Sequence, residues 1–310
     1  MGAIFSKIVI VGVGLLGGSL GLALKKRKLA DVVIGVDSNS ECLAEAVRLG
    51  VIDQAAADLK IAFELLDSFT DFPAESSEES ENTEKNRRKS RYTELVIVCT
   101  PVGSVANIVL ETAKIAGNRH LLITDVGSTK NEIAGQLEKQ LPDNIRYVGS
   151  HPIAGSEKKG PKNANADLFA GHLTVLTPTD EETVLETTIL EHFWNLLGST
   201  VVQIPPKQHD SILARTSHFP HLLASLLLQT LKTGDHIMVG PGFRSTTRLA
   251  ASDPVLWADV FLSNKDAVSD AIDVMQKQLN SFQQLLHDGD HETIVKLLTK
   301  SKKQRDALEK

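Results

Sequence analysis

One histidine lies in a segment that could support acid–base chemistry. His151 follows a short strand-like run at residues 146–149, and the chain then turns through Pro152 and Gly155. An imidazole titrates near neutral pH and is the commonest general base in enzymes. A lone histidine in a turn can also serve only as a hydrogen-bonding group, so the rest of the chain decides between the two interpretations.

Two hydroxyl side chains occupy positions similar to that of His151. Thr100 follows a predicted strand at 95–99, and Ser128 follows one at 121–124. Strand-end loops of one parallel sheet converge on a single crevice, where such folds bind ligands. We therefore expect the three residues to lie close together in a sheet-edge site. Ser128 could also cap the helix predicted after it, a role compatible with the first.

A glycine-rich turn supplies the element that would bring a cofactor to this edge. The β-branched run 7–11 predicts a buried strand, and it leads directly into Gly12, Gly14 and Gly17. Gly12 permits a tight turn, Gly14 lets the backbone approach a pyrophosphate, and Gly17 lets the helix at 16–26 pack on the strand. The free N–H groups at the start of that helix would face the phosphates. The pattern predicts a dinucleotide-binding βαβ unit; a glycine turn without a ligand is the alternative.

An acidic residue then favours one dinucleotide over the other. Asp37 ends the predicted strand 32–36 and lies 20 residues after Gly17, where a carboxylate binds ribose hydroxyls. It would repel a 2′-phosphate, and no arginine follows it directly, so we expect NAD in preference to NADP. The residues expected to contact the cofactor are Gly12, Gly14, Leu15, Leu16, Gly17, Asp37, Thr100 and Pro101.

The chain is long enough for two domains. Its 310 residues predict an α/β Rossmann-type dinucleotide-binding domain over 1–204 and an all-α domain over 205–310, with Pro205-Pro206 at the boundary. Strands at 172–177 and 200–204 are expected to close the sheet of the first domain. In the second domain we expect a long helical stretch, kinked by Pro220, and amphipathic C-terminal helices suited to a bundle or dimer interface. Its predicted helices span 208–231, 265–286 and 291–308.

One segment departs from this alternation. Residues 71–84 carry six acids and no base, and residues 85–91 carry five bases. Such a segment buries too little apolar surface to offset its ordering entropy. We predict a mobile charged insertion over about 70–92 on the surface of the first domain.

The composition excludes several classes of partner. A net charge of -6 does not favour nucleic acid or an anionic membrane, and no apolar run reaches the length of a membrane span. The two cysteines, Cys42 and Cys99, lie inside predicted elements and indicate neither a disulfide framework nor a metal site. We expect a cytoplasmic enzyme that acts on a small molecule.

Five segments together resemble the prephenate/arogenate dehydrogenase family of tyrosine biosynthesis, over nearly the whole chain apart from the charged insertion. The segments are Gly12–Ser19, Asp125–Ser128, His151–Glu157, Ser217–His221 and Thr247–Trp257. The resemblance implies an NAD(P)-binding domain coupled to a helical domain that forms a homodimer. It also implies an oxidative decarboxylation in which hydride goes to the nicotinamide and the ring carboxylate leaves as carbon dioxide.

The resemblance also assigns roles to individual residues. It makes His151 the base or hydrogen-bond acceptor for the ring hydroxyl, with Ser128 helping to orient both groups. Arg248 would hold a substrate carboxylate through its planar fork. The remaining substrate-binding candidates are His218 and His221 in the pocket wall, Arg244 as a second anion contact, and Trp257 toward the partner subunit's pocket or in the core. Members often pair Glu157 with an acid where this chain has Ser245, which leaves an ionic gate in doubt.

Three alternatives stay open at this stage. No residue decides between prephenate, which would give 4-hydroxyphenylpyruvate, and arogenate, which would give tyrosine. A β-hydroxyacid dehydrogenase shares the two-domain layout but relies on a lysine in its helical domain. A non-catalytic NAD-binding regulator would bind the dinucleotide without needing His151. Prephenate with NAD is the function that we predict.

Overall fold

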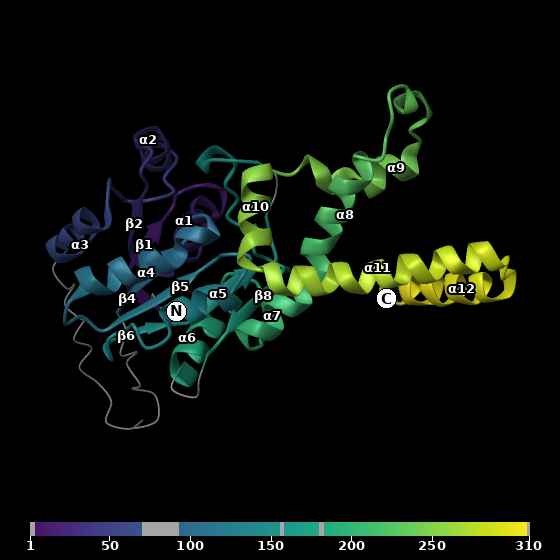
Figure 1. Cartoon of the computed structure of the whole chain (residues 1–310). Coiled ribbons are helices and arrows are strands. Elements are labelled where there is room, and N and C mark those ends of the chain that lie inside the picture. The colour runs from purple at the N-terminus through teal and green to yellow at the C-terminus, as the bar shows by residue number, and fades with distance from the viewer. Residues whose placement is uncertain (1–3, 70–92, 156–157, 180–182, 309–310) are drawn as a thin grey trace. The chain divides into compact units, whose positions relative to one another are not determined.

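The computed structural model describes residues 4–69, 93–155, 158–179 and 183–308 (Figure 1). The chain forms two compact units. Unit 1 comprises residues 1–212 and 251–264, and unit 2 comprises residues 213–250 and 265–310. The charged insertion predicted over 70–92 lies outside the described residues. In the part of the chain that the structure describes, no helix is long and apolar enough to cross a membrane.

Unit 1 is built on a six-stranded parallel sheet of order β3-β2-β1-β4-β5-β6. The strands are β1 (Phe5–Val11), β2 (Ala30–Val36), β3 (Gln54–Ala56), β4 (Glu94–Val98), β5 (Leu121–Asp125) and β6 (Ile145–Tyr147). Strands β4 and β5 are buried along their whole length, as expected for a sheet covered on both faces. This order is that of a Rossmann fold, so the predicted fold class is confirmed.

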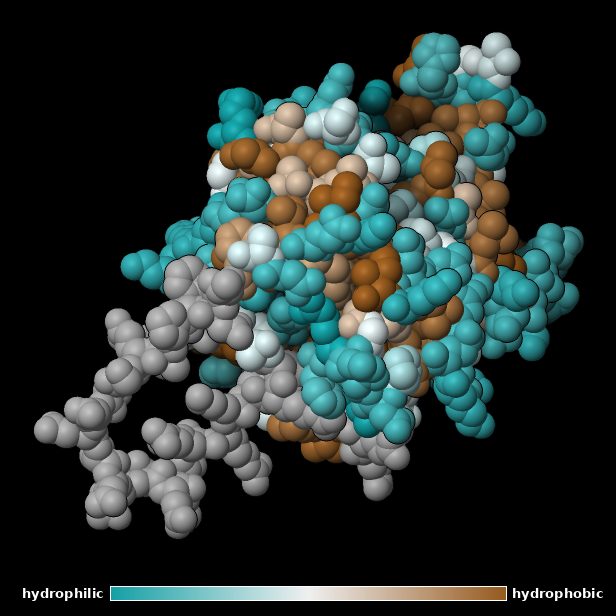
Figure 2. Space-filling model, turned by 90° about the vertical axis from the view of Figure 1, so that its left-hand side faces the viewer, coloured by the Kyte–Doolittle hydropathy of each residue, from teal (hydrophilic) through white to brown (hydrophobic). Residues whose placement is uncertain are grey.

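Helices cover both faces of this sheet. One face carries α1 (Leu15–Arg27), α2 (Ser40–Arg48) and α6 (Val184–Leu196), and the other carries α3 (Leu59–Ser68), α4 (Val102–Ala116) and α5 (Asn131–Leu137). Figure 2 shows the side on which α2 and α3 lie, where hydrophilic residues are interspersed with hydrophobic ones. Helix α3 was not predicted, although its buried residues recur at helical spacing: Leu59, Ala62, Phe63 and Leu66.

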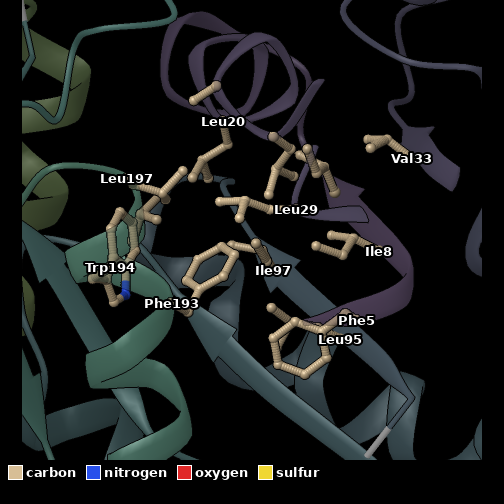
Figure 3. Packing of buried hydrophobic residues seen from close by; sticks show 14 of the residues in the cluster. Phe5, Ile8, Leu20, Leu29, Val33, Leu95, Ile97, Phe193, Trp194 and Leu197 are labelled. Carbon is tan, nitrogen blue, oxygen red and sulfur yellow. The ribbon is translucent and has the colours of Figure 1, made fainter. Parts of the chain in front are cut away.

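Aromatic residues of α6 fill the core on the first face. Phe193 packs edge-on against Phe5 of β1 with ring centroids 6.0 Å apart, and Trp194 packs against Phe169 at 5.4 Å. Figure 3 shows Phe193 next to Ile97 of β4 and Trp194 next to Leu197. All of these side chains are fully buried. Helix α6 is thereby held against the strands that carry the candidate site.

A second sheet of three strands was not predicted. It contains β7 (Gly149–Pro152), β8 (Leu173–Thr177) and β9 (Thr200–Gln203); β7 is antiparallel to β8, and β9 is parallel to it. The expectation that the last two strands close the first sheet was therefore wrong. So was the placement of His151 in a strand-end loop, because it lies within β7, paired with Val175.

A side chain at the end of β5 contacts the backbone of β7. The carboxylate of Asp125, the last residue of β5, accepts the backbone N–H of Ser150 at 3.3 Å. The backbone of β7 itself pairs with β8. His151 consequently lies just beyond the carboxyl ends of β5 and β6.

The remaining elements are helical. The stretch predicted as one helix over 208–231 is divided into α7 (Pro206–Leu213), a π-helical turn (Ala214–His218) and α8 (Phe219–Leu228). Pro220 has no N–H to donate, and Phe219 donates to the carbonyl of Ala214 five residues back. The other helices are α9 (Pro241–Thr246), α10 (Pro254–Ser263), α11 (Lys265–Asp288) and α12 (His291–Ala307), with a 3₁₀ turn at Arg248–Ala251. Within unit 2, α11 and α12 run side by side (Figure 1).

Candidate active site

A cleft of about 460 Å³ lies at the carboxyl edge of β1, β2 and β4. It is lined by five of the residues predicted to contact a cofactor: Gly12, Gly14, Asp37, Thr100 and Pro101. Leu15 and Leu16 begin α1 beside it and are half-buried. The cleft lies where the strand order changes direction between β1 and β4, which is where doubly wound sheets bind dinucleotides.

The three glycines of the turn have different surroundings. Gly12 has a φ of +94°, and a Cβ there would lie 2.8 Å from the carbonyl oxygen of Cys99. A Cβ on Gly17 would lie 2.0 Å from the carbonyl oxygen of Gly12, so α1 packs on the turn only because residue 17 has no side chain. A Cβ on Gly14 would meet no atom within 4 Å. The backbone at the start of α1 therefore faces open space, and the site fits a dinucleotide pyrophosphate.

Asp37 holds the turn and faces the same cleft. Its Oδ2 accepts the N–H of Val13 at 3.0 Å, and its Oδ1 accepts the N–H of Asn39 at 2.9 Å. The carboxylate is thus fixed between the glycine turn and the end of β2. A ribose in the cleft would find a negatively charged acceptor for its hydroxyl groups, and a 2′-phosphate would meet an adverse charge.

His151 is buried, and it is the first member of a chain of hydrogen-bonded side chains. Its Nδ1 lies 2.8 Å from Nε2 of His209, and Nδ1 of His209 lies 2.7 Å from Oδ1 of Asp210. Asp210 also accepts the backbone N–H groups of Lys130 at 2.9 Å and Asn131 at 2.8 Å. His209 and Asp210 were not predicted as site residues. They lie next to each other in α7, and both are buried there.

The strand that carries His151 is anchored through its neighbour Ser150. Trp194 Nε1 donates to Ser150 Oγ at 3.1 Å, and Ser150 Oγ lies 2.7 Å from Thr124 Oγ1. Thr124 in turn donates to the carbonyl oxygen of Val148 at 2.7 Å. All these groups are buried. Because Trp194 is part of the hydrophobic core, the position of β7 is coupled to the packing of α6.

A buried ion pair lies behind the same strand. Lys130 Nζ donates to Asp125 Oδ2, Tyr147 donates its hydroxyl to Asp125 Oδ1 at 2.8 Å, and Gly127 N donates to Oδ2 at 2.8 Å. Burial lowers the pKa of Lys130, an effect that the charge of Asp125 opposes. Burial also raises the pKa of Tyr147 well above its usual range, and Asp125 adds to this. These groups hold the loop after β5 and are not exposed to a ligand.

The hydroxyl residues predicted near His151 lie at the ends of neighbouring strands. Thr100 lines the cleft after β4, where its Oγ1 accepts from Ser104 at 3.0 Å. Ser128 is half-buried in the loop between β5 and α5. Neighbouring Cys99 is not a nucleophile, because burial and the charge of Asp125 raise the pKa of its thiol. The resemblance gave Ser128 a part in orienting the imidazole of His151, and at Nδ1 that imidazole also has His209 as a hydrogen-bond partner.

Unit 2 brings together two of the predicted substrate-binding residues. His221 Nδ1 donates to the carbonyl oxygen of Ser217 at 3.0 Å. Burial lowers the pKa of His221, the Ser217 carbonyl opposes this, and the positive charge of nearby Arg248 lowers the pKa further. His218 is buried, whereas Arg244 and Arg248 are exposed. A neutral imidazole and an exposed guanidinium therefore lie close together in this unit.

Trp257 lies on α10 in unit 1 and is half-buried against Phe261, with ring centroids 5.6 Å apart. Helix α10 is joined to the loop after β5 by a hydrogen bond of 2.9 Å between Thr129 and Ser263. Ser245, which replaces the acid of an ionic gate, is exposed on α9, and Glu157 lies outside the described residues. Among the described residues, no group of three or more His, Cys, Asp or Glu side chains could hold a metal ion.

Comparisons with known proteins agree with this architecture. Residues 74–203 match the family model described as "Prephenate dehydrogenase, nucleotide-binding domain", and residues 205–300 match "Prephenate dehydrogenase, dimerization domain". The first match begins after the glycine turn, so the support for Gly12 to Gly17 is their geometry.

Three relatives cover nearly the whole chain. A prephenate dehydrogenase of Bacillus subtilis is 32% identical over 97% of this chain and 76% of its own length, and a cyclohexadienyl dehydrogenase of Zymomonas mobilis is 29% identical over 98% and 97%. The crystal structure of prephenate dehydrogenase from A. aeolicus with hydroxyphenyl propionate and NAD+ superposes with a TM-score of 0.82, at 30% identity and 98% coverage of both chains. This chain belongs to the prephenate dehydrogenase family.

Proposed function

We propose that the protein is an NAD-dependent prephenate dehydrogenase that converts prephenate to 4-hydroxyphenylpyruvate in tyrosine biosynthesis. One structural observation carries the proposal: a dinucleotide cleft lies at the carboxyl edge of the first sheet, and a buried, hydrogen-bonded histidine lies just beyond the carboxyl ends of β5 and β6 in the same unit. The membership of the family and the NAD+ named in the A. aeolicus structure support the same activity and cofactor.

The chain's residues would hold the cofactor through its phosphates and one ribose. The open backbone at Gly14 and the start of α1 would receive the pyrophosphate, and Asp37 would accept the ribose hydroxyls. The bound nicotinamide supplies a hydride acceptor. Thr100 and Pro101, after β4, line the cleft between the two halves of the sheet.

His151 would act on the hydroxyl group of the substrate ring. The C–H bond at the hydroxyl-bearing carbon breaks with its electron pair, while the bond to the ring carboxylate breaks and its electrons enter the ring. Carbon dioxide leaves and the ring becomes aromatic. Nε2 of His151 would accept a hydrogen bond from the hydroxyl as its oxygen donates electron density, and the proton stays on the phenol oxygen of the product. Such a base contributes roughly 10²–10⁴-fold in rate.

Cationic and imidazole side chains of unit 2 would bind the substrate's carboxylates. Arg248 offers a planar fork that pairs with a carboxylate through two hydrogen bonds. His218 and His221 are proposed to line the pocket, with Arg244 as a second anion contact and Ser128 beside the hydroxyl. Trp257 is proposed to face the pocket or to pack in the core.

Arogenate is the second candidate substrate. The Zymomonas mobilis relative is named for the cyclohexadienyl ring that prephenate and arogenate share, and the two molecules differ only in a keto or amino group on the side chain. Arogenate would give tyrosine directly by the same bond changes.

Steady-state rates with each substrate and each dinucleotide test the proposal. We expect turnover of prephenate with NAD, and slower turnover with NADP. His151→Asn should lower kcat by roughly 10²–10⁴-fold with nearly unchanged affinity for NAD. His172→Asn is the matched control, because the His172 side chain is exposed and its Nδ1 bonds to the nearby carbonyl of Ala170. Absence of turnover with both substrates would refute the activity and leave a dinucleotide-binding regulator, and equal rates for His151→Asn would refute the base role.

We further propose a cytoplasmic homodimer with a nucleotide-binding part over 1–204 and a helical part over 205–310. Large apolar side chains are exposed along α11 and α12 of the single chain: Val274, Leu279, Leu286, Val295 and Leu298. A monomer rarely exposes so many large apolar side chains on two adjacent helices, and a second copy of the chain would cover them. Light scattering should give a dimer for the wild type and a monomer for Leu279→Glu, whereas an unchanged dimer would place the interface elsewhere.

A further inference from the structure

The chain of side chains behind His151 runs through two residues that have no direct route to a ligand. His209 is fully buried, and Asp210 is 2% exposed. The two imidazole rings meet edge to face, with centroids 5.0 Å apart and an angle of 65° between their planes. The short distances, 2.8 Å between the two imidazoles and 2.7 Å from His209 to Asp210, show that the side chains bond to one another directly.

The position of the protons follows from the far end of the chain. Asp210 accepts three N–H groups, from Lys130 and Asn131 at the start of α5 and from His209. An ionised carboxylate only accepts hydrogen bonds, and the N-terminus of a helix stabilises its charge. Nδ1 of His209 therefore carries a proton, which leaves a lone pair on its Nε2.

The same logic extends to the candidate base. Because Nε2 of His209 is an acceptor, Nδ1 of His151 must donate to it across the 2.8 Å separation. A neutral imidazole has one N–H, so the lone pair of His151 is then on Nε2. We propose that His209, supported by Asp210, is a positioning residue that holds His151 in the tautomer whose Nε2 is basic.

The arrangement also affects the charge that develops on His151. When the ring hydroxyl shares its proton with Nε2, positive charge grows on the imidazole. His209 accepts from the opposite side of that ring and is polarised by the carboxylate of Asp210. The other charges near the chain, Lys130 and Asp125, neutralise each other in a buried pair. Loss of the correct tautomer in a Ser-His-Asp triad costs about 10⁴-fold in kcat.

The backbone of the two residues is itself held. Asn264 donates through Nδ2 to the carbonyl oxygen of Asp210 at 2.8 Å, and His209 N–H bonds to the carbonyl of Pro205 at 3.0 Å. The start of α7 is thus fixed to the end of α10 and to the loop after β5 within unit 1. This rigidity suits a group that must present one nitrogen at a constant place.

The deciding measurement is the tautomer of His151 in the folded protein, observed by nitrogen NMR on histidine-labelled protein and assigned with His151→Asn. At neutral pH we expect Nδ1 to show the shift of a protonated nitrogen and Nε2 that of an unprotonated one. The reverse pattern would overturn the proposal. This readout needs no turnover, so it stands apart from the proposed dehydrogenase activity, whose own failure would appear as a wild-type protein inactive on both substrates.

Variants of His209 supply the kinetic arm of the test. His209→Leu fills the space of the imidazole with an apolar side chain but removes the hydrogen-bond acceptor. It should lower kcat roughly 10²–10⁴-fold with little change in NAD affinity. His209→Gln can accept from Nδ1 of His151 through its amide oxygen and should recover at least tenfold of that loss. Full activity of His209→Leu, or no recovery in His209→Gln, would contradict the role. If His209→Leu does not fold, His209→Gln and the NMR measurement decide.

A matched control separates positioning from general damage. His172→Gln changes an exposed histidine of the same unit and should leave kcat and the His151 signals unchanged. In His209→Leu the Nδ1 signal of His151 should change, because its acceptor is gone, while melting curves report the integrity of the fold. A structural role alone would move the melting temperature without altering which nitrogen of His151 carries the proton.

Discussion

Trp194 donates its indole N–H to Ser150 Oγ at 3.1 Å, which links the largest side chain of the core to the residue before His151. Ser150 is also bonded to Thr124, at the end region of β5. Strand β7, which carries His151, is therefore held by the buried hydroxyl of Ser150, whose partners are Trp194 on α6 and Thr124 in the central sheet.

Ser150→Ala should lower both stability and activity. The substitution leaves the indole N–H of Trp194 without its acceptor, at a cost of about 1–3 kcal/mol in the free energy of unfolding. We also expect a lower kcat with unchanged NAD affinity, because the cleft is not altered. Thermal melting and kinetics check this, with Ser68→Ala at an exposed helix position as control. Equal losses in the two variants would show that the link is unimportant.

Gly14 and Gly17 should respond in opposite ways to alanine. A Cβ at residue 17 meets the carbonyl oxygen of Gly12, so Gly17→Ala should strongly destabilise the protein. A Cβ at residue 14 meets nothing in the protein but would lie where the pyrophosphate binds. Gly14→Ala should therefore keep the melting temperature and weaken NAD binding, measured by calorimetry. Wild-type NAD affinity in Gly14→Ala would argue against this cleft as the cofactor site.

Asp37 should set the preference between the two dinucleotides. Asp37→Asn removes a charge-assisted hydrogen bond to the ribose, worth about 1.5–3 kcal/mol, and also the repulsion of a 2′-phosphate. The ratio of kcat/KM for NAD over NADP should fall roughly tenfold or more. Asp58→Asn removes a charge from the same cleft, at a residue that caps α3, and should change the ratio less. A larger effect from Asp58→Asn would reassign the ribose contact.

Arg248 should bind a substrate carboxylate in a way that lysine cannot. Arg248→Lys keeps the charge but loses the two-pronged geometry, so KM for prephenate should rise roughly tenfold or more with NAD affinity unchanged. Arg244→Lys provides the comparison, since both arginines are exposed in unit 2. A rise in KM confined to Arg244→Lys would show that Arg244, and not Arg248, holds the carboxylate through two hydrogen bonds.

The pH dependence of stability should carry a contribution from His221. Burial lowers the pKa of this imidazole, and Arg248 lowers it further, so the unfolded chain binds more protons than the folded protein just below the usual pKa of about 6.5. Stability should therefore fall as the pH drops through that value and level off once the folded imidazole is protonated. His221→Asn and, less strongly, Arg248→Ala should flatten the melting temperature in this range. An identical profile in His221→Asn would exclude the contribution.

Local patterns were enough to predict the Rossmann unit. The features that predict it are close together in the sequence: the apolar run of β1, the glycines after it and Asp37. Each of these features is typical of a single structural role. Helix α3 was missed although its apolar residues have helical spacing.

The second sheet and the residues behind His151 depend on contacts that sequence spacing does not reveal. The pairing of β7 with β8 joins residues about 25 positions apart, and the Asp125 carboxylate at the end of β5 bonds to the backbone of β7 at Ser150. His209 lies 58 residues from His151, at the start of a helix where a polar residue is ordinary. Its role becomes visible only when the two imidazole nitrogens are seen to face each other.

Gly149 marks the passage of the chain from the first sheet to the second. A Cβ there would lie 2.6 Å from Thr177 Oγ1 and 2.9 Å from the side chain of Lys130, so the buried ion pair of Lys130 and Asp125 closes directly over the backbone. Local opening of β7 would expose that pair and break the bonds of Ser150 as well. The amide hydrogens of β7 should thus exchange with solvent only when the whole unit unfolds. The position of His151 is therefore as stable as the fold of unit 1 itself.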